Sequence, residues 1–88
     1  MDHLERMMER DDQLRGLVSV IGQTMATGVP QTIETAFNAL IFMRPGALNA
    51  AINHFQDNLN ARGLQLIKPC ENKVKVEEVS HGSQGNGQ

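Results

Sequence analysis

The side chains best suited to metal binding or nucleophilic chemistry in this sequence are three histidines and one cysteine, namely His3, His54, His81 and Cys70. Zinc sites usually bring such residues together in short spacings such as C-x-x-C or H-x-x-x-H. No two of these four residues have that spacing, and His81 falls in the polar C-terminal stretch. The sequence therefore predicts no metal site.

Catalysis by Cys70 is not expected either. A nucleophilic cysteine needs a stabilised thiolate and a nearby base, and the negative charge of the adjacent Glu71 works against a thiolate. The sequence also lacks a nucleophile elbow, a phosphate-cradling glycine loop and a recognisable pair of catalytic carboxylates. We therefore expect a protein that is not an enzyme and carries no cofactor.

A cytoplasmic location is expected from three features. A single cysteine cannot form an intramolecular disulfide, which suits a reducing compartment. Residues 1–12 are charged throughout and do not resemble a signal peptide. No apolar run approaches the ~18 residues of a membrane-spanning helix, so no membrane association is expected.

The charge distribution is uneven although the formal net charge is only −2. Residues 37–76 contain five basic and two acidic side chains, a local charge of +3, whereas residues 1–15 contain five acidic side chains and three arginines. A negative net charge argues against nucleic-acid binding along the whole surface. The local excess of basic residues permits, without requiring, one phosphate-facing side.

A long first helix is predicted over residues 4–25, where apolar side chains recur at helical spacing. Asp2 followed by Glu5 has the spacing of a capping box at its start. Gly28, with Pro30 two positions later, predicts its end. Gly16 and Gly22 each cost ~1 kcal/mol relative to alanine, so a bend or break is expected near them.

Two further helices are predicted. One begins at residues 30–32 and ends before Pro45, since the residue before a proline avoids the helical region. The next covers residues 45–62 and ends at Gly63, which can adopt the left-handed conformation without steric cost. Leu64 then falls where a Schellman closure brings it against Leu59.

A β-hairpin is predicted after this helix, from strands at residues 64–67 and 74–79 joined by the loop formers of residues 69–72. Val74 and Val76 alternate with Lys73 and Lys75, which predicts one face on the helices and one in water. The expected fold is mainly α with a C-terminal β-hairpin, a three-helix α-α-α-β-β domain over residues 1–79. Residues 80–88 have no apolar side chain to bury and are expected to form a disordered tail.

Three short segments carry a resemblance to the winged helix-turn-helix family of DNA-binding domains. They are residues 32–36 (TIETA) opening the second helix, residues 45–48 (PGAL) opening the third, and residues 62–67 (RGLQLI) entering the hairpin. The order of three helices and a hairpin matches the winged-helix arrangement over roughly residues 33–79. The sequence departs from the winged-helix pattern in two respects: the third helix is about one turn longer than the family usually shows, and the turn at residues 43–46 lacks a serine or threonine cap.

The resemblance implies a small transcriptional regulator that binds double-stranded DNA. The exposed side of the third helix would enter the major groove, where asparagine and glutamine can pair with adenine; the implied base-reading residues are Asn49, Asn53, Gln56 and Asn60. The implied phosphate contacts, which would fix the docking, are Arg44, Lys68, Lys73 and Lys75.

Plain alternatives exist for these residues. The amides also suit the ordinary polar face of a soluble helix, and Lys73 and Lys75 also suit strand charges that discourage sheet-to-sheet aggregation. The second functional hypothesis is accordingly a protein-binding adaptor or inhibitor that acts through its first helix or its hairpin edge. The acidic first helix and the scarcity of aromatic residues for base stacking favour it.

A homodimer is also expected, because the predicted first helix carries more apolar surface than two short helices and a hairpin can cover. Met7, Met8 and Met25 could form an adaptable contact surface on that helix, since methionine repacks easily against varied partners. The alternative is that these methionines belong to the core.

Overall fold

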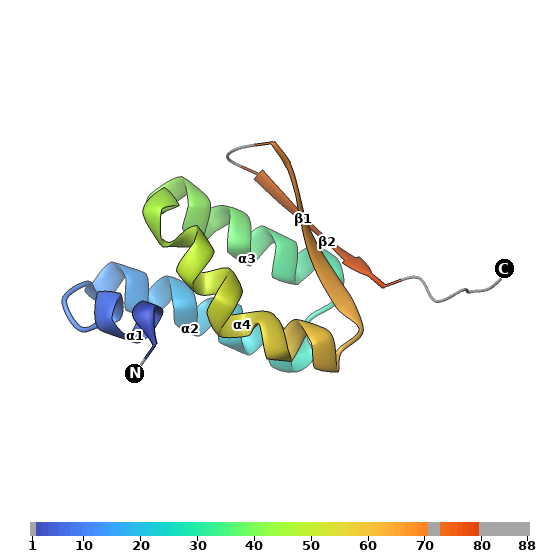
Figure 1. Ribbon diagram of the computed structural model, residues 1–88, viewed down its shortest axis with the longest axis horizontal. Coiled ribbons are helices and arrows are strands. Elements are labelled where there is room, and N and C mark those ends of the chain that lie inside the picture. Colours follow the sequence, from blue (N-terminus) through green and yellow to red (C-terminus); the bar gives the residue numbers. More distant parts are fainter. Residues whose placement is uncertain (1, 71–72, 80–88) are drawn as a thin grey trace, which may run out of the picture.

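The computed structural model describes residues 2–70 and 73–79 of the chain. Within them it contains four α-helices, α1 (His3–Met8), α2 (Asp12–Thr27), α3 (Pro30–Met43) and α4 (Leu48–Ala61), and a 3₁₀ turn, η1 (Pro45–Ala47). Two antiparallel strands follow, β1 (Leu64–Cys70) and β2 (Lys73–Glu78) (Figure 1). The prediction of a mainly helical fold with a C-terminal hairpin is confirmed. The expected tail at residues 80–88, His81 and Glu71 lie outside the described residues.

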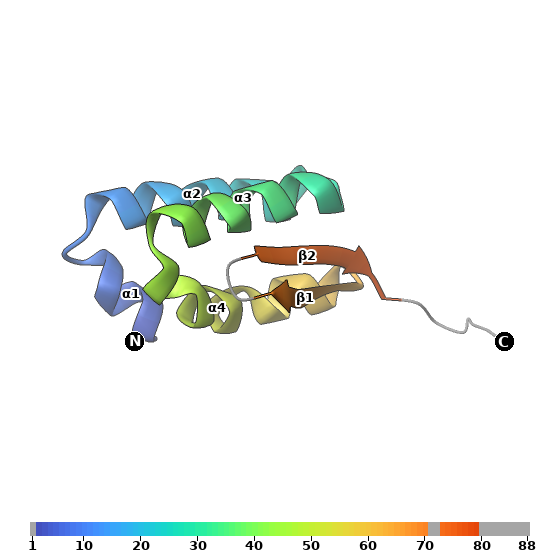
Figure 2. The same cartoon turned by 90° about the horizontal axis from the view of Figure 1, so that it is seen from above.

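The N-terminal helix is broken at residues 9–11, not at the glycines where we expected a break. The capping box is present: Asp2 Oδ1 accepts from the N–H of Glu5 at 2.9 Å, and Glu5 Oε1 accepts from the N–H of Asp2 at 3.4 Å. Asp11 Oδ1 then accepts from the N–H of Leu14 at 3.0 Å and begins α2. A side chain that caps a new helix competes with continuation of the old one. Figure 2 shows the result, with α1 beside α4 and α2 in a separate layer beside α3.

Gly16 and Gly22 lie inside α2 without interrupting it. The prediction of a break near them was wrong because the buried side of α2 offsets the cost of a glycine. That side consists of Leu14, Val18, Ile21 and Met25. Burial of such side chains contributes ~1.5–3 kcal/mol each, against ~1 kcal/mol lost at each glycine.

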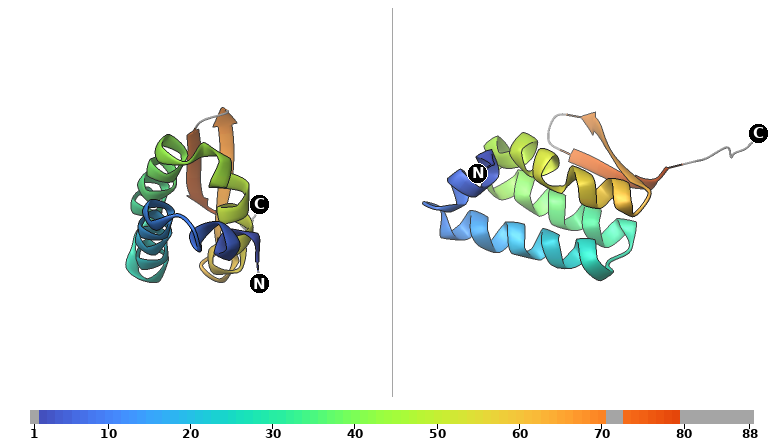
Figure 3. Two further views of the ribbon diagram at one scale, coloured as in Figure 1. Left: turned by 90° about the vertical axis from the view of Figure 1, so that its left-hand side faces the viewer. Right: turned by 60° about the horizontal axis from the view of Figure 1, so that its bottom comes forward.

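The connection from α2 to α3 behaves as predicted. The N–H of Gly28 donates to the carbonyl oxygen of Thr24 at 2.7 Å, and Pro30 occupies the first turn of α3. A Cβ atom at Gly28 would lie 2.7 Å from that same carbonyl oxygen, so glycine is required for this close approach. The two helices consequently run in opposite directions side by side (Figure 3).

The corner between α3 and α4 and the end of α4 also follow the sequence. Arg44, before Pro45, has the non-helical angles φ −144° and ψ 69°, and the predicted helix at residues 45–62 appears as η1 followed by α4. Gly63 has φ +66°, the predicted left-handed conformation. Leu59 and Leu64 are both buried on either side of it.

The hairpin lies between α3 and α4, with β2 against α3 and β1 against α4 (Figures 1 and 2). Leu66 pairs with Val76, and the register becomes irregular between Ile67 and Cys70. Val74 and Val76 are buried while Lys73 and Lys75 are exposed, as the alternation predicted. A two-stranded hairpin is marginal alone in water, so its packing on two helices is what stabilises it.

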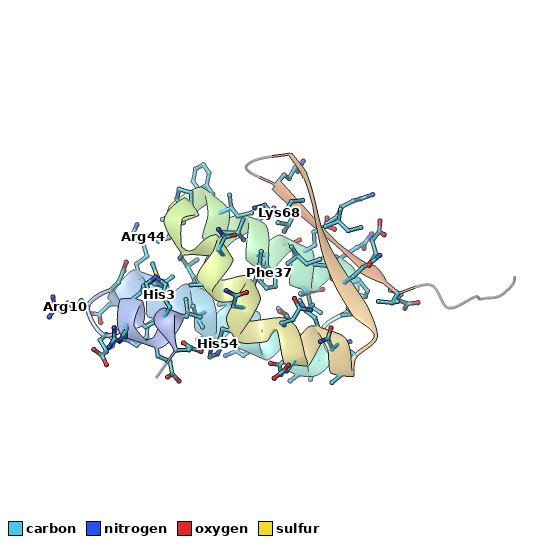
Figure 4. The ribbon with its side chains drawn as sticks, viewed as in Figure 1. His3, Arg10, Phe37, Arg44, His54 and Lys68 are labelled. Carbon is cyan, nitrogen blue, oxygen red and sulfur yellow. The ribbon has the colours of Figure 1, made fainter. Side chains whose placement is uncertain are left out.

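The core lies where α2, α3, α4 and the hairpin meet. Phe37 is fully buried at its centre (Figure 4), and its ring meets the ring of Phe55 edge to face, with the ring centres 6.1 Å apart. Met25 is 4% exposed, and Met7 and Met8 are partly buried against the same core. Met25 therefore belongs to the core, whereas Met7 and Met8 pack against the core with part of each side chain exposed. The homodimer expected through the first helix stays a prediction.

Candidate functional site

The four amide side chains named from the sequence lie on the outer side of α4. They are Asn49, Asn53, Gln56 and Asn60, all exposed. Their spacing of four, three and four residues keeps them in one row. The opposite side of α4 is buried in the core, including Ala51, Phe55 and Leu59.

This amide row is not free of competing interactions. Gln56 Nε2 donates to Asn60 Oδ1 at 3.0 Å, so these two side chains bind each other. Asp57, also exposed, lies next to Gln56 in the sequence and adds a negative charge to this side of the helix. A carboxylate here repels the phosphates of a nucleic acid that approaches α4.

Arg44 lies at the corner between α3 and α4 and is engaged by an acidic partner. Its Nε donates to Asp11 Oδ2 at 2.8 Å, its Nη2 to Asp11 Oδ1 at 3.5 Å, and its Nη1 to the carbonyl oxygen of Met43 at 2.9 Å. The hydrogen bond from Arg44 and the N–H of Leu14 hold the pKa of Asp11 below its usual value. Arg44 thereby ties the start of α2 to the end of α3, and Asp11 compensates its charge (Figure 4).

The three lysines named from the sequence are all exposed on the hairpin. Lys75 Nζ lies 3.9 Å from Glu77 Oε2, at the outer limit of an ion pair. Lys73 borders a surface hollow together with Asn38, Ile41, Phe42 and Pro45. Among the described residues, carboxylates lie beside two of the four predicted phosphate contacts, Arg44 and Lys75.

Arg62 has a structural role that the sequence reasoning missed. Its Nη1 donates to the carbonyl oxygens of Thr24 at 3.3 Å and Met25 at 2.9 Å, and its Nη2 donates to that of Gly28 at 2.6 Å. These oxygens end α2, whose last turn contains no basic residue. A helix C-terminus attracts positive charge. The absence of a basic residue from the last turn of α2 therefore indicated that a cation from another part of the chain would cap this helix.

His54 joins α1 to α4. Its Nδ1 lies 2.6 Å from Asp2 Oδ2, and its ring lies edge to face on Phe55 at 4.8 Å between ring centres. The hydrogen bond from His54, followed by that from the N–H of Glu5, lowers the pKa of Asp2. Among the side chains described, those of residues 2–68 and 73–79, no group of three or more histidine, cysteine, aspartate or glutamate residues could hold a metal ion.

The outer side of the α2–α3 layer is a surface with few charges that the sequence reasoning did not identify. We call it the α2–α3 face and define it by Val20, Thr24, Thr35, Ala39 and, at its end, Phe42, which also borders the hollow that contains Lys73. Val20 is 50% exposed and Phe42 is 85% exposed. Val20 and Thr24 from α2, with Thr35 and Ala39 from α3, border an open hollow of about 460 Å³.

Ionisable side chains are rare in these two helices after the first turn of α2, which contains Asp12 and Arg15. Across residues 16–43 Glu34 is the single ionisable residue. Its Oε1 accepts from the N–H of Val76 at 3.0 Å, so the carboxylate is directed at β2, away from the α2–α3 face. This long uncharged stretch was visible in the sequence, but only the structure places two exposed strips of it next to each other.

The threonine hydroxyls of the α2–α3 face are used by their own helices. Thr24 Oγ1 donates to the carbonyl oxygen of Ile21 at 2.7 Å, and Thr35 Oγ1 donates to that of Gln31 at 2.9 Å. Their hydrogens are thus not offered to a partner, which leaves the methyl groups as the main contact area. The face is therefore more apolar than two threonines suggest, because their methyl groups and not their hydroxyl hydrogens are available for contact.

No helix among the described residues has the length and apolar character needed to cross a membrane. Comparison of the chain with protein-family models, with curated proteins and with solved structures gives no match. Two surfaces of the molecule are candidates for a functional role: the polar outer side of α4 with the hairpin lysines, and the α2–α3 face.

Proposed function

We propose that this chain is a small non-catalytic protein-binding module that acts through the α2–α3 face. The observation that carries the proposal is the exposure of Val20 and Phe42 on helices in which Glu34, bound to the backbone of β2, is the single ionisable residue of residues 16–43. Single exposed apolar residues are normal on soluble proteins, whereas a continuous uncharged surface with a hollow marks an interaction site.

The position of the α2–α3 face supports a binding role. Figure 2 shows α2 and α3 in one layer, with α4 and the hairpin on one side of it. The hollow of the face is lined by side chains of α2 and α3 alone, so a partner bound in it leaves the core packing unchanged. Phe42 supplies a rigid aromatic side chain at one end of the face, and the hollow lies near Thr35 and Ala39. Aromatic anchors and the pockets that receive them provide most of the binding energy in protein interfaces.

The experiment that tests this proposal is site-specific photocrosslinking in cells that produce the protein. A photoreactive amino acid replaces Ala39 on the α2–α3 face in one variant and Asn53 on the outer side of α4 in the matched control, both exposed helical positions. We expect crosslinked protein adducts from position 39 and few from position 53. Absence of adducts from position 39, or equal adducts from both positions, would contradict the proposal.

Binding of double-stranded DNA is the second candidate function, because the outer side of α4 presents four amides in one row beside a hairpin that carries exposed lysines. Two features make it the weaker candidate. Acidic partners accompany Arg44 and Lys75, which leaves few cations to neutralise phosphates and hence a weak affinity. In addition, α3 and α4 run in opposite directions along the long axis (Figure 2), whereas the helices of a helix-turn-helix cross at roughly 90–120°.

Mobility of a mixed pool of DNA duplexes, at low and at moderate salt, separates the two functions. The protein-binding proposal expects no shift at moderate salt. If a shift occurs, Lys73→Glu combined with Lys75→Glu should weaken it and flatten its salt dependence when the hairpin contacts phosphates. A shift that survives moderate salt and is lost in that double variant would favour DNA binding as the function.

A further inference from the structure

We infer that the partner of the α2–α3 face is the same face of a second copy of this chain. This inference rests on the proposed function, because it names the protein that the face binds. In a two-fold dimer the same patch is used on both subunits, so every contact between two residues occurs twice. The face must therefore be complementary to itself in charge, in shape and in area.

Charge is the first requirement. The chain has a formal net charge of −2, and exposed acidic side chains such as Asp2, Glu5 and Glu9 lie on or next to α1. A contact that used α1 on both copies would bring like charges together. The α2–α3 face avoids this repulsion between acidic groups, because Glu34, the one ionisable residue of residues 16–43, is bound to the backbone of β2. Lys73 of the hairpin borders a hollow with Phe42 at the end of the face, so its amine must remain in water in the contact. A strongly charged partner, in contrast, would lose hydration on this face without gaining a counter-charge.

Shape is the second requirement. The face contains a projecting group, Phe42, and a hollow of about 460 Å³ that lies between α2 and α3 next to Thr35 and Ala39. Thr35 and Phe42 are seven residues apart on one side of α3, which corresponds to about 10 Å along the helix. A two-fold axis between them brings the Phe42 ring of each copy over the hollow of the other. Small side chains at Ala36 and Ala39 leave room for that ring.

Area is the third requirement, and it places the contact among the weak, reversible interfaces. Two adjacent helices of 16 and 14 residues present a footprint of roughly 22 by 20 Å, which gives about 450 Å² per copy and about 900 Å² for the pair. Specific interfaces bury about 1,200–2,000 Å², and smaller ones are weak or transient. We therefore expect a reversible dimer with a dissociation constant of about 1–100 µM.

Sedimentation velocity of the purified full chain, between about 1 and 500 µM to bracket that constant, tests the inference. We expect the mass to rise with concentration from the 9.7 kDa monomer towards twice that value. Ala39→Glu places a charge on the face and should keep the protein monomeric throughout. Asn53→Glu, the matched control on the outer side of α4, should dimerise like the parent chain. Because Ala39 and Asn53 are exposed helical positions, circular dichroism should show both variants folded.

Two results would overturn the inference. One is a parent chain that stays monomeric up to about 500 µM, the top of the chosen range; the other is an Ala39→Glu variant that dimerises as the parent does. The photocrosslinking experiment distinguishes this failure from failure of the proposed function. A monomeric chain that still crosslinks from position 39 to a different protein keeps the protein-binding role and rejects the second copy, whereas a monomeric chain without such adducts rejects both.

Discussion

The side chain of Asn38 on α3 makes two hydrogen bonds with the backbone of Val74 in β2. Asn38 Nδ2 donates to the carbonyl oxygen of Val74 at 3.2 Å, and Asn38 Oδ1 accepts from the N–H of Val74 at 2.9 Å. The carboxylate of Glu34, one turn earlier, accepts from the N–H of Val76. Two polar side chains of a helix thus take the place of a neighbouring strand along the outer edge of β2, an edge that would otherwise be open to pairing with another chain.

Replacement of Asn38 by alanine should therefore destabilise the protein. The N–H and carbonyl of Val74 would lose their partner in a partly buried position, which costs about 1–3 kcal/mol. Urea denaturation should show a lower midpoint with an unchanged slope. Asn53→Ala on the exposed side of α4 is the control, with an expected change within ~0.5 kcal/mol. Equal stability of the two variants would mean that the edge of β2 does not depend on Asn38.

Phe37 and Phe42 provide a second matched pair, five residues apart on α3. Phe37 is fully buried against Phe55, whereas Phe42 is 85% exposed. Phe37→Ala should cost about 3–5 kcal/mol because it leaves a cavity in the core. Phe42→Ala should change the stability of the monomer by less than about 0.5 kcal/mol while weakening any dimer. Thermal unfolding at a concentration below the dimer range checks both variants; a large loss in Phe42→Ala would place its ring in the core.

Two glycines should respond in opposite ways to replacement by alanine. Gly63 has φ +66°, a conformation that costs a residue with a side chain about 1–2 kcal/mol. Gly16 lies in the middle of α2, and a Cβ atom added there would have no neighbouring atom within 4 Å. Alanine at that position should therefore stabilise the protein by up to about 1 kcal/mol. Denaturant midpoints that move in the same direction for both variants would contradict the prediction.

The pH dependence of stability should reflect Asp11. The hydrogen bond from Arg44 and the cap on Leu14 lower the pKa of Asp11 in the folded protein. A group with a lowered folded pKa stabilises the protein above its unfolded pKa of about 3.9, and this stabilisation is lost as the pH falls through the folded value. Asp11→Asn retains a capping oxygen but removes the charge. The variant should be less stable than the parent at about pH 7 (chosen well above the pKa of about 3.9), and the difference should shrink in acid.

The control for this effect is Asp57→Asn, at an exposed position on α4. Thermal unfolding of both variants, followed from neutral pH into acid, provides the measurement. We expect the Asp57 variant to follow the pH profile of the parent. A stability gap for Asp11→Asn that stays constant into acid would show that its cause is not the charge.

Much of the fold was predictable from local patterns. The capping box at Asp2, the turn at Gly28 and Pro30, the non-helical Arg44 before Pro45 and the left-handed Gly63 depend on neighbours a few residues away. The alternation of valine and lysine in β2 similarly predicted which of its side chains are buried. These predictions were correct because the features depend on backbone geometry and on short-range hydrogen bonds.

The break in the N-terminal helix was predicted at the wrong place. Two glycines were taken as the weakest points, yet the helix is interrupted at residues 9–11. There the side chain of Asp11 caps α2 and also binds Arg44. The contact with Arg44 joins residues that are 33 positions apart. A prediction from neighbouring residues could not include it, and therefore relied on the low helix propensity of the glycines.

Residue types and their spacing alone determined the helices, the hairpin, the core side of each element and the exposure of the α4 amides. Only the tertiary structure decided which polar groups are free to bind something else. Arg44 and Arg62 proved to be engaged within the fold, and Val20 of α2 proved to border one hollow with Thr35 and Ala39 of α3. The physical reason is that hydrogen bonds and ion pairs between distant segments form only when packing brings those segments together, whereas helical and strand periodicity is already present in the unfolded chain.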